Sequence, residues 1–468
     1  MAKYKAYPEY KDSGVEWLGE IPEHWKLSKL RYQFVFSKGL TITKEHLQDE
    51  GIPCVNYGEV HSKYGFEVDP EIHTLKCVSD KYLKDNSNSL LAKGDIVFAD
   101  TSEDIDGSGN FTQLVSDTVT FAGYHTIIAR PFERENSRFY AYLLDCKELR
   151  SQVRHAVKGV KVFSITQAIL RNLSIWLPSK DEQAQIAAFL DHETAKIDNL
   201  IEKQQQLIEL LKEKRQAVIS HAVTKGLNPD VPMKDSDVEW LGEIPEHWAL
   251  WKFSHIAPIL TCGVASTPTY VDAAEGMPFL SAQNVKFDKL HLDKYNFISV
   301  DLHKQLTKNR RPLKGDLLVT RVGAGIGEAC VIDTDMEFSI YVSLTHIRLD
   351  PVLAHNRFIM YFFNSSYCHF LNYQGTVTGG GVGNLNVQNM KDYKIALPCI
   401  EEQKRIVSHL DLINKQFDIL TSKAELGIKL MQERRTALIS AAVTGKIDVR
   451  DWVAPDTQEA QEPQEATA

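Results

Sequence analysis

The chain has 468 residues, of which 43% are hydrophobic and 25% are charged, and its formal net charge is −9. This is globular composition with enough length for two or three cores, which excludes a mainly disordered chain. No apolar run reaches the ~20 residues of a membrane helix, and the first residues lack the apolar core of a signal peptide, so we expect a cytoplasmic protein. The seven cysteines form no CxxC pair, which argues against a disulfide framework and against a zinc site of paired cysteines.

The chain contains an internal duplication. Residues 11–27 read KDSGVEWLGEIPEHWKL and residues 234–250 read KDSDVEWLGEIPEHWAL, so 15 of 17 positions repeat at an offset of 223. Solenoid repeats run to roughly 20–50 residues, so this offset indicates two homologous domains on similar frames. His24 and His247 recur here beside tryptophan and proline, and we predict that the element packs as a rigid docking element rather than performing catalysis. Whether it caps the frame or contacts a partner stays open.

The two halves differ most between the repeated blocks. Residues 26–180 and 249–400 mix short β-rich runs with loops and helices, which indicates two α/β domains. The sequences GDIVF at 94–98 and GDLLV at 315–319 predict the same turn and strand in both.

A long amphipathic helix is predicted after each variable region, at residues 181–226 and 401–446. Apolar residues there recur at steps of three, four or seven, a pattern typical of coiled coils. About 40 residues at 1.5 Å each give a rod of roughly 60 Å. We expect the two helices to pack antiparallel about a pseudo-two-fold axis; the alternative is that each packs on its own domain. The predicted scaffold positions are Ile186, Leu190, Ile197, Leu211, Ile406, Leu410, Phe417 and Met431, and the same stripes include Leu200, Leu207 and Leu420.

Three further segments complete the predicted organisation. Residues 1–25 hold the first repeated element. Residues 227–248 form a linker with two prolines followed by the second repeated element. Residues 447–468 are predicted to be a disordered acidic tail, because residues 455–468 are polar and acidic and lack aromatic residues.

Basic residues gather in both variable regions. Five lie between residues 150 and 171 with no acid among them, and six lie between residues 304 and 321 around the single acid Asp316. Such a cluster is most often a solvated face. Its presence in both halves of a duplicated chain nevertheless favours DNA binding, in which Lys and Arg neutralise phosphate.

The sequence shows no catalytic, cofactor-binding or metal-binding motif. The run GAGIG at 323–327 follows a strand and continues as one, whereas a nucleotide loop should open a helix. We predict a tight turn there, with a loop beside DNA backbone as the alternative. Neither GxxxxGK[ST], HExxH nor an amino-methyltransferase motif is present, so we expect the chain not to be an enzyme by itself.

Taken together, these features resemble the specificity subunit of type I restriction-modification enzymes, over nearly the whole chain. Each variable region ends in an LP…EQ…I…L entry to a long helix. The entries are Leu177, Pro178, Glu182, Gln183, Ile186 and Leu190 in the first half, and Leu397, Pro398, Glu402, Gln403, Ile406 and Leu410 in the second. The run GGGVGNLN at 379–386 also resembles the family's segment before the final strand, whereas the first half has GVKVFS at 159–164 instead.

The resemblance implies an α+β fold in which two α/β target recognition domains are held apart by two long antiparallel coiled-coil helices. Each domain would read one half of an asymmetric bipartite DNA target, and the helices would set the spacer and dock two methyltransferase subunits. Those subunits would methylate adenine N6 with their own S-adenosylmethionine, and restriction subunits using ATP and Mg would cut unmodified DNA. The chain itself would hold no cofactor. Two different domains on a two-fold frame independently favour two different half-sites, and adenine chemistry requires an extruded base with room for a catalytic partner.

Seven residues are predicted to contact DNA. Arg154, Lys158, Lys161 and Arg321 are candidates for phosphate contacts, and Thr320, Asn384 and Asn386 are candidates for base-edge or backbone contacts. A competing hypothesis is a coiled-coil adaptor that holds two copies of a protein and never touches DNA. A nuclease is disfavoured by the missing metal and nucleophile motifs.

Overall fold

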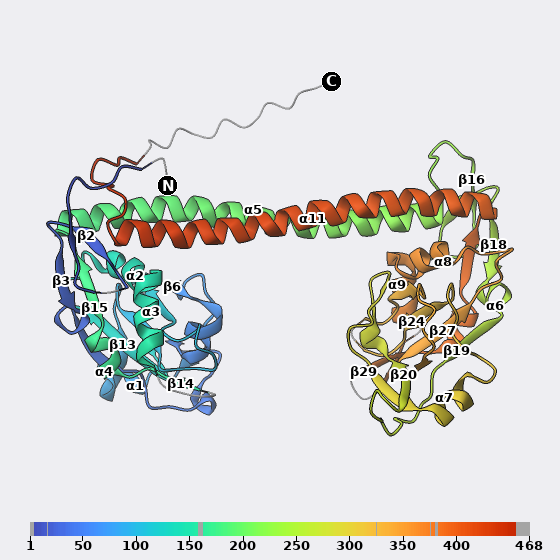
Figure 1. Cartoon of the computed structure of the whole chain (residues 1–468), viewed down its shortest axis with the longest axis horizontal. Coiled ribbons are helices and arrows are strands. Elements are labelled where there is room, and N and C mark those ends of the chain that lie inside the picture. The colour runs from blue at the N-terminus through green and yellow to red at the C-terminus, as the bar shows by residue number, and fades with distance from the viewer. Residues whose placement is uncertain are drawn as a thin grey trace. The chain divides into compact units, whose positions relative to one another are not determined.

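The computed structural model describes residues 4–15, 17–157, 162–323, 325–374, 376–379 and 382–454. The chain divides into two compact units (Figure 1). Unit 1 comprises residues 1–203 and 427–468, and unit 2 comprises residues 204–426. Each unit therefore combines one variable region with a segment of both long helices. Across the described residues, no helix is long and apolar enough to cross a membrane.

The domain of unit 1, called domain 1 below, is built on two small sheets. The main sheet has the order β4-β13-β9-β11-β6 and the second has the order β7-β5-β12-β8. In the main sheet all neighbours are antiparallel except β11 and β6. The main strands are β4 (Phe34–Lys38), β13 (Thr126–Pro131), β9 (Ile96–Ala99), β11 (Phe111–Leu114) and β6 (Phe66–Val68), and the others are β7 (Cys77–Val78), β5 (Ile52–Val55), β12 (Thr120–Ala122) and β8 (Leu90–Leu91).

Three strand pairs and several helices complete domain 1. The pairs are β1 (Tyr10–Asp12) with β2 (Glu20–Pro22), β3 (Lys26–Lys29) with β15 (Ser174–Leu177), and β10 (Thr101–Ser102) with β14 (Phe163–Ser164). The α-helices are α1 (Tyr82–Asp85), α2 (Ser137–Asp145), α3 (Lys147–Ala156) and α4 (Gln167–Asn172), and a π-helix, η3, spans Glu59–Lys63. Three 3₁₀ turns lie at Leu30–Tyr32, Lys44–His46 and Ser87–Ser89.

The unbroken apolar run in β9 is explained by burial of both faces of the main sheet. Successive side chains of a strand point to opposite faces. Ile96 and Phe98 enter a core with helix α2, while Val97 and Ala99 enter another with β5 and β12. The same division recurs in unit 2, where Leu317 and Leu318 belong to different cores. The predicted common strand is therefore confirmed.

The domain of unit 2, called domain 2, repeats this plan with shorter sheets. Its sheets have the orders β19-β27-β24-β25 and β23-β20-β26. The strands are β19 (Ile259–Cys262), β27 (Leu344–Arg348), β24 (Leu317–Thr320), β25 (Ala329–Val331), β23 (Asn296–Ser299), β20 (Gly276–Leu280) and β26 (Ser339–Ile340). The strand pairs are β16 (Met233–Asp235) with β17 (Glu243–Pro245), β18 (Ala249–Lys252) with β30 (Lys394–Leu397), β21 (Val285–Lys286) with β22 (Lys289–Leu290), and β28 (Thr376–Gly379) with β29 (Val382–Leu385). The helices are α6 (Phe253–Ile256), α7 (Val300–Thr307), α8 (Asn356–Phe363), α9 (Ser366–Gln374) and α10 (Val387–Lys391), with a 3₁₀ turn at Ala282–Asn284.

The two long helices occur where the sequence predicts them. Helix α5 spans Lys180–Lys225 and α11 spans Ile400–Val443. Acidic residues in their first turns favour the helix dipole. In unit 1 the indole nitrogen of Trp176, just before α5, donates to the carbonyl of Val443 at the end of α11. In unit 2 Arg215, late in α5, bonds Asn414 in the first half of α11. The helix segments therefore run antiparallel in each unit, and the α+β fold with an internal repeat is confirmed.

Most of the predicted scaffold residues are buried. Ile186, Leu190 and Ile197 pack into the core of unit 1 and Ile406 and Leu410 into that of unit 2. Phe417 is also buried, and Leu211 and Met431 are half-buried.

The wider stripes are only partly buried, which corrects the sequence expectation. Leu200, Leu207 and Leu420 are 50%, 41% and 49% exposed. A two-helix seam covers a narrow stripe of each helix, so apolar residues beside the seam remain in solvent. The helices also pack on the domains, since Tyr142 of α2 bonds Asp191 of α5. Both packing alternatives that the sequence left open therefore occur together.

Candidate nucleic-acid interface

In both domains a central strand leads into a loop that pairs with the segment preceding the final strand. In unit 1, β10 follows β9 and pairs with β14. In unit 2, β24 leads into Arg321, and the Arg321 carbonyl accepts the N–H of Leu385 in β29 at 2.9 Å. The Arg321 guanidinium also donates from Nε to the Leu385 carbonyl at 3.0 Å. Arg321 thus fastens this loop to the β28–β29 hairpin.

The residues of unit 2 that are predicted to contact DNA differ in their exposure to solvent. Thr320 is 1% exposed, so it cannot reach a base in this structure, and we remove it from the candidates. It lies on β24, whose four residues are all buried. Asn384 and Asn386 are exposed. The Asn386 side chain accepts from Gln388 N–H at 2.9 Å and caps α10. Contacts of Arg321, Asn384 and Asn386 with DNA stay predictions.

In unit 1 only one of the three predicted contacts can be placed. Arg154 lies on α3, with its NH2 group 3.4 Å from Asp106 Oδ1. This pair is partly exposed, so DNA phosphate could compete for the guanidinium. Lys158 and Lys161 lie outside the described residues, and so do Gly380 and Gly381 of the second half's glycine run. Of the tail predicted at 447–468, residues 455–468 also lie outside them. Its start is not disordered, because Ile447 and Val449 are buried in the core of unit 1.

Sequence reasoning missed a cavity of mixed polar and apolar lining in domain 1. It holds about 670 Å³ and is lined by Gly39, Asp100, His125 and Gln167, among others. The His125 ring lies 3.2 Å from the Asp100 carboxylate, and the His125 backbone has a φ of 54°. The cavity offers both donors and acceptors for hydrogen bonds. No sequence pattern marks it, because its lining comes from β4, β13, α4 and the loops beside them.

A smaller cavity lies beside strands β19 and β27 of domain 2. It holds about 290 Å³ and is lined by Thr261, Arg310 and His346, among others. His346 Nε2 lies 2.7 Å from Asp316 Oδ2, and Arg348 donates to the same oxygen at 2.7 Å. Burial acts to raise the pKa of Asp316, but hydrogen bonds from His346 and Arg348 outweigh it, and the pKa is lowered. The carboxylate is therefore held charged inside the domain.

Among the described residues, no group of three or more His, Cys, Asp or Glu side chains could hold a metal ion. The described part of the GAGIG run joins β24 to β25, which pair antiparallel. It is therefore a strand-to-strand connection, as predicted, and it does not open a helix as a nucleotide loop would.

The repeated element of each unit docks on the first turn of a long helix. His24 Nε2 lies 2.9 Å from Glu182, and the indole of Trp25 donates to Glu182 at 3.1 Å. In unit 2, His247 and Trp248 contact Glu402 at 2.9 and 3.2 Å. The predicted packing role of the histidines is confirmed, because each holds a structural carboxylate.

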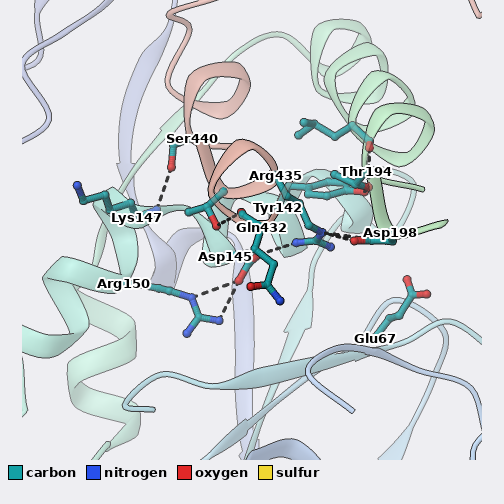
Figure 2. Close-up of polar contacts among 12 residues, drawn as sticks. Glu67, Tyr142, Asp145, Lys147, Arg150, Thr194, Asp198, Gln432, Arg435 and Ser440 are labelled. Atoms are coloured by element: carbon teal, nitrogen blue, oxygen red, sulfur yellow. Dashed lines mark hydrogen bonds and ion pairs between the residues drawn. The ribbon is translucent and has the colours of Figure 1, made fainter. Parts of the chain in front are cut away.

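A second repeated set of contacts fastens each domain to the long helix that follows it. Tyr142 donates to Asp191 at 2.6 Å and Arg138 donates to the same carboxylate at 2.7 Å. Tyr361 and Arg357 make the same contacts with Asp411, both at 2.6 Å. Figure 2 shows Tyr142 beside Thr194 of α5. We call each arrangement the socket of its domain.

Comparison with known proteins agrees with the duplicated plan. The family model described as "Type I restriction modification DNA specificity domain" matches residues 22–210 and 247–429. A protein of Methanocaldococcus jannaschii that carries the name of the MjaX type I restriction enzyme specificity subunit is 26% identical over 92% of this chain and 96% of its own length. The EcoKI specificity subunit of Escherichia coli K12 is 22% identical over 92% of this chain and 90% of its own length.

Solved structures share the fold. A chain from a study of complex assembly and conformational transition of the type I R-M system has a TM-score of 0.67 and 16% identity. That match covers 91% of this chain and 99% of the other. The HsdS subunit of Thermoanaerobacter tengcongensis has a TM-score of 0.51 and 15% identity, covering 93% of this chain and all of the other. At these identities the likeness concerns the fold alone.

Proposed function

Because this chain belongs to the type I restriction modification DNA specificity domain family, we propose that it directs a type I restriction-modification complex to one bipartite DNA target. Domain 1 would read one half-site and domain 2 the other. The observation that carries this proposal is the match of the family model to two separate spans, one in each half of the chain. Two domains of different sequence favour an asymmetric target.

The proposed complex supplies the chemistry that this chain lacks. Two methyltransferase subunits would bind the helices and repeated elements and transfer methyl groups from S-adenosylmethionine to adenine N6. Restriction subunits would use ATP and Mg. Exposed apolar residues on the helix segments of unit 2, including Leu207, Leu210, Leu412 and Ile419, support a protein partner there, because burying such side chains favours association.

The direct test is to express the chain with the methyltransferase encoded beside it and to map N6-methyladenine across the genome at base resolution. We expect one bipartite motif with a fixed gap and one modified adenine on each strand. A complex that assembles but leaves no motif would contradict the proposal. In that case, DNA binding by the complex is measured at increasing salt concentration. Binding that weakens steeply with salt indicates contacts with DNA phosphates, whereas the adaptor hypothesis predicts no such binding.

Exchange of one domain tests whether the two readers are independent. Residues 26–176 would be replaced by the corresponding region of another family member. We expect only one half-site of the motif to change, which also assigns that half-site to domain 1. A change in both halves would contradict independent reading.

The role of the helices as a spacer is tested by insertion. Four residues inserted near Gln204, Gln205 and Gln206 add about 6 Å of helix, and a matched insertion after Leu426 keeps the antiparallel segments in register. We expect the gap to grow by one or two base pairs, at roughly 3.4 Å each. The same insertion into the linker after Asn228 is the control, and an unchanged gap in the helix variant would refute the spacer role.

A further inference from the structure

Two arginines occupy equivalent positions on the long helices. Arg215 and Arg435 are separated by 220 residues, the same offset that relates Asp191 to Asp411. Each contacts the domain of the other half of the chain. Arg435 lies on α11, which follows domain 2, yet it reaches domain 1 within unit 1. Arg215 lies on α5, which follows domain 1, yet it reaches domain 2 within unit 2.

Figure 2 shows Arg435 between Asp198 and Asp145. Its Nε donates to the two carboxylate oxygens of Asp198, on α5, at 3.0 and 3.2 Å. Its NH1 group lies 3.6 Å from Asp145 Oδ2, at the end of α2. The guanidinium carbon lies 5.4 Å from the centre of the Phe66 ring. One side chain thus joins both helices to an acid and an aromatic ring of domain 1.

Arg215 does the same in unit 2 with different partners. Its Nε donates to Asn414 Oδ1 at 3.0 Å and its NH1 donates to Asp418 Oδ1 at 2.8 Å. Its guanidinium carbon lies 5.6 Å from the centre of the Phe287 ring, which belongs to the turn between β21 and β22. A cavity of about 480 Å³ lies beside this contact, and both Arg215 and Phe287 line it.

Both rings are presented by backbone in the left-handed region. Phe66 has a φ of 74° and Phe287 a φ of 35°. A bulky residue is rare in this region, and the conformation persists only where the surroundings impose it. The two rings come from different elements, one at the start of a strand and one in a hairpin turn. The same arginine contact therefore arises twice on unlike domain surfaces.

Burial and geometry make these contacts more directional than ordinary surface ion pairs. The side chains of Arg435 and Arg215 are 22% and 19% exposed. A planar guanidinium accepts stacking on one face while its edge donates in fixed directions. It therefore restrains rotation of the domain about the socket as well as its distance from the helices.

We propose that Arg435 and Arg215 are positioning residues that set the orientation in which domain 1 and domain 2, respectively, meet DNA. This inference rests on the proposed function. It predicts a crossed effect, because loss of an arginine on one helix impairs reading by the domain of the other half.

The test uses the full chain in complex with its methyltransferase and the motif found for the wild type. Methylation rates are measured on duplexes with the cognate motif and on duplexes with one substituted base pair in either half-site. We expect Arg435→Ala to lower discrimination at the half-site of domain 1 about tenfold and to leave the other within twofold. Arg215→Ala should do the reverse. The matched controls are Arg434→Ala and Lys214→Ala, adjacent exposed cations on the same helices.

The ratio of rates separates positioning from stability, because a smaller folded fraction lowers all rates equally. Equal loss at both half-sites, an uncrossed loss or no loss would overturn the proposal. If an alanine variant does not assemble, the same rates are measured for Arg435→Lys and Arg215→Lys. Lysine keeps the positive charge but lacks the planar guanidinium. Unchanged discrimination in both lysine variants would also overturn it. If the wild type yields no bipartite motif, the proposed function itself is contradicted. That outcome is distinguishable from failure of the positioning role, which requires a motif in the wild type.

Discussion

The repeated element docks on a glutamate in the same way in both units, but a different amount of chain packs over that contact. Glu182 in unit 1 accepts hydrogen bonds from Trp25 and also from Tyr7, at 2.5 Å. Glu402 in unit 2 has no counterpart of Tyr7, because the equivalent position is Asp230 in the linker. The Glu182 side chain is 4% exposed and that of Glu402 is 18% exposed. The same motif is therefore more deeply buried where an additional segment of chain packs over it.

Removal of the docking carboxylates should give the largest difference between the units. Glu182→Ala leaves Tyr7 and Trp25 with buried, unpaired donors, and we expect it to destabilise unit 1 by about 3 kcal/mol. Glu402→Ala should cost unit 2 about 1–2 kcal/mol, because Glu402 is itself partly exposed and lacks the tyrosine partner of Glu182. Hydrogen exchange, read separately in each unit, measures both losses. Glu209→Ala, at an exposed position of α5, is the control, and equal losses would contradict the comparison.

The residue at the C-terminal end of helix α2 or α8 differs between the domains. It is Asp145, the last residue of α2, in domain 1 and Asn364, just after α8, in domain 2. Asn364 in unit 2 donates to the Ala329 carbonyl and accepts from the Ala329 N–H, both at 2.9 Å. Asn364→Asp replaces the donor with an oxygen facing that carbonyl, and we expect a loss of about 2–3 kcal/mol. Asp145→Asn in unit 1 keeps an oxygen for Arg150 and should cost about 1 kcal/mol. Denaturant unfolding monitored by hydrogen exchange measures the loss of stability in each unit. A larger loss for Asp145→Asn than for Asn364→Asp would contradict the prediction.

The socket tyrosines, Tyr142 and Tyr361, make equivalent contacts, so their removal should cost the two units similar stability. Tyr142→Phe removes the hydrogen bond to Asp191, and Tyr361→Phe removes the bond to Asp411. Because the acceptor is charged, we expect each variant to lose about 1.5–2 kcal/mol in its own unit. Tyr373→Phe, at an 81% exposed position, serves as the control. A difference of more than about 1 kcal/mol between the two variants would refute equivalence.

The smallest expected effect concerns acid. The pKa of Asp316 is lowered because hydrogen bonds from His346 and Arg348 outweigh burial. A lowered pKa stabilises the folded state fully above the unfolded value of about 3.9, and this contribution is lost as the pH falls through the folded pKa. We expect unit 2 to lose protection as the pH falls below about 4, as measured by hydrogen exchange. Asp316→Asn should flatten this dependence, whereas Asp335→Asn, at an exposed site, should not.

The local pattern of the sequence determined the duplication, the long helices and the strand common to both domains. Repeats and apolar periodicity are carried by neighbouring residues, so they can be recognised without the fold. The LP…EQ entry is equally local. Its glutamates contact the repeated tryptophans, so two patterns recognised separately in the sequence meet in one contact.

Only the tertiary structure decided which side chains reach the surface and which distant residues meet. Thr320 looked suitable for DNA contact but lies in a strand buried on both faces, and burial of both faces depends on a second sheet elsewhere in the chain. Arg435 bonds Asp198 across 237 residues. The sequence alone gives no sign that an arginine at the end of one helix contacts the domain preceding the other helix. Antiparallel packing of the helix segments within each unit creates that contact.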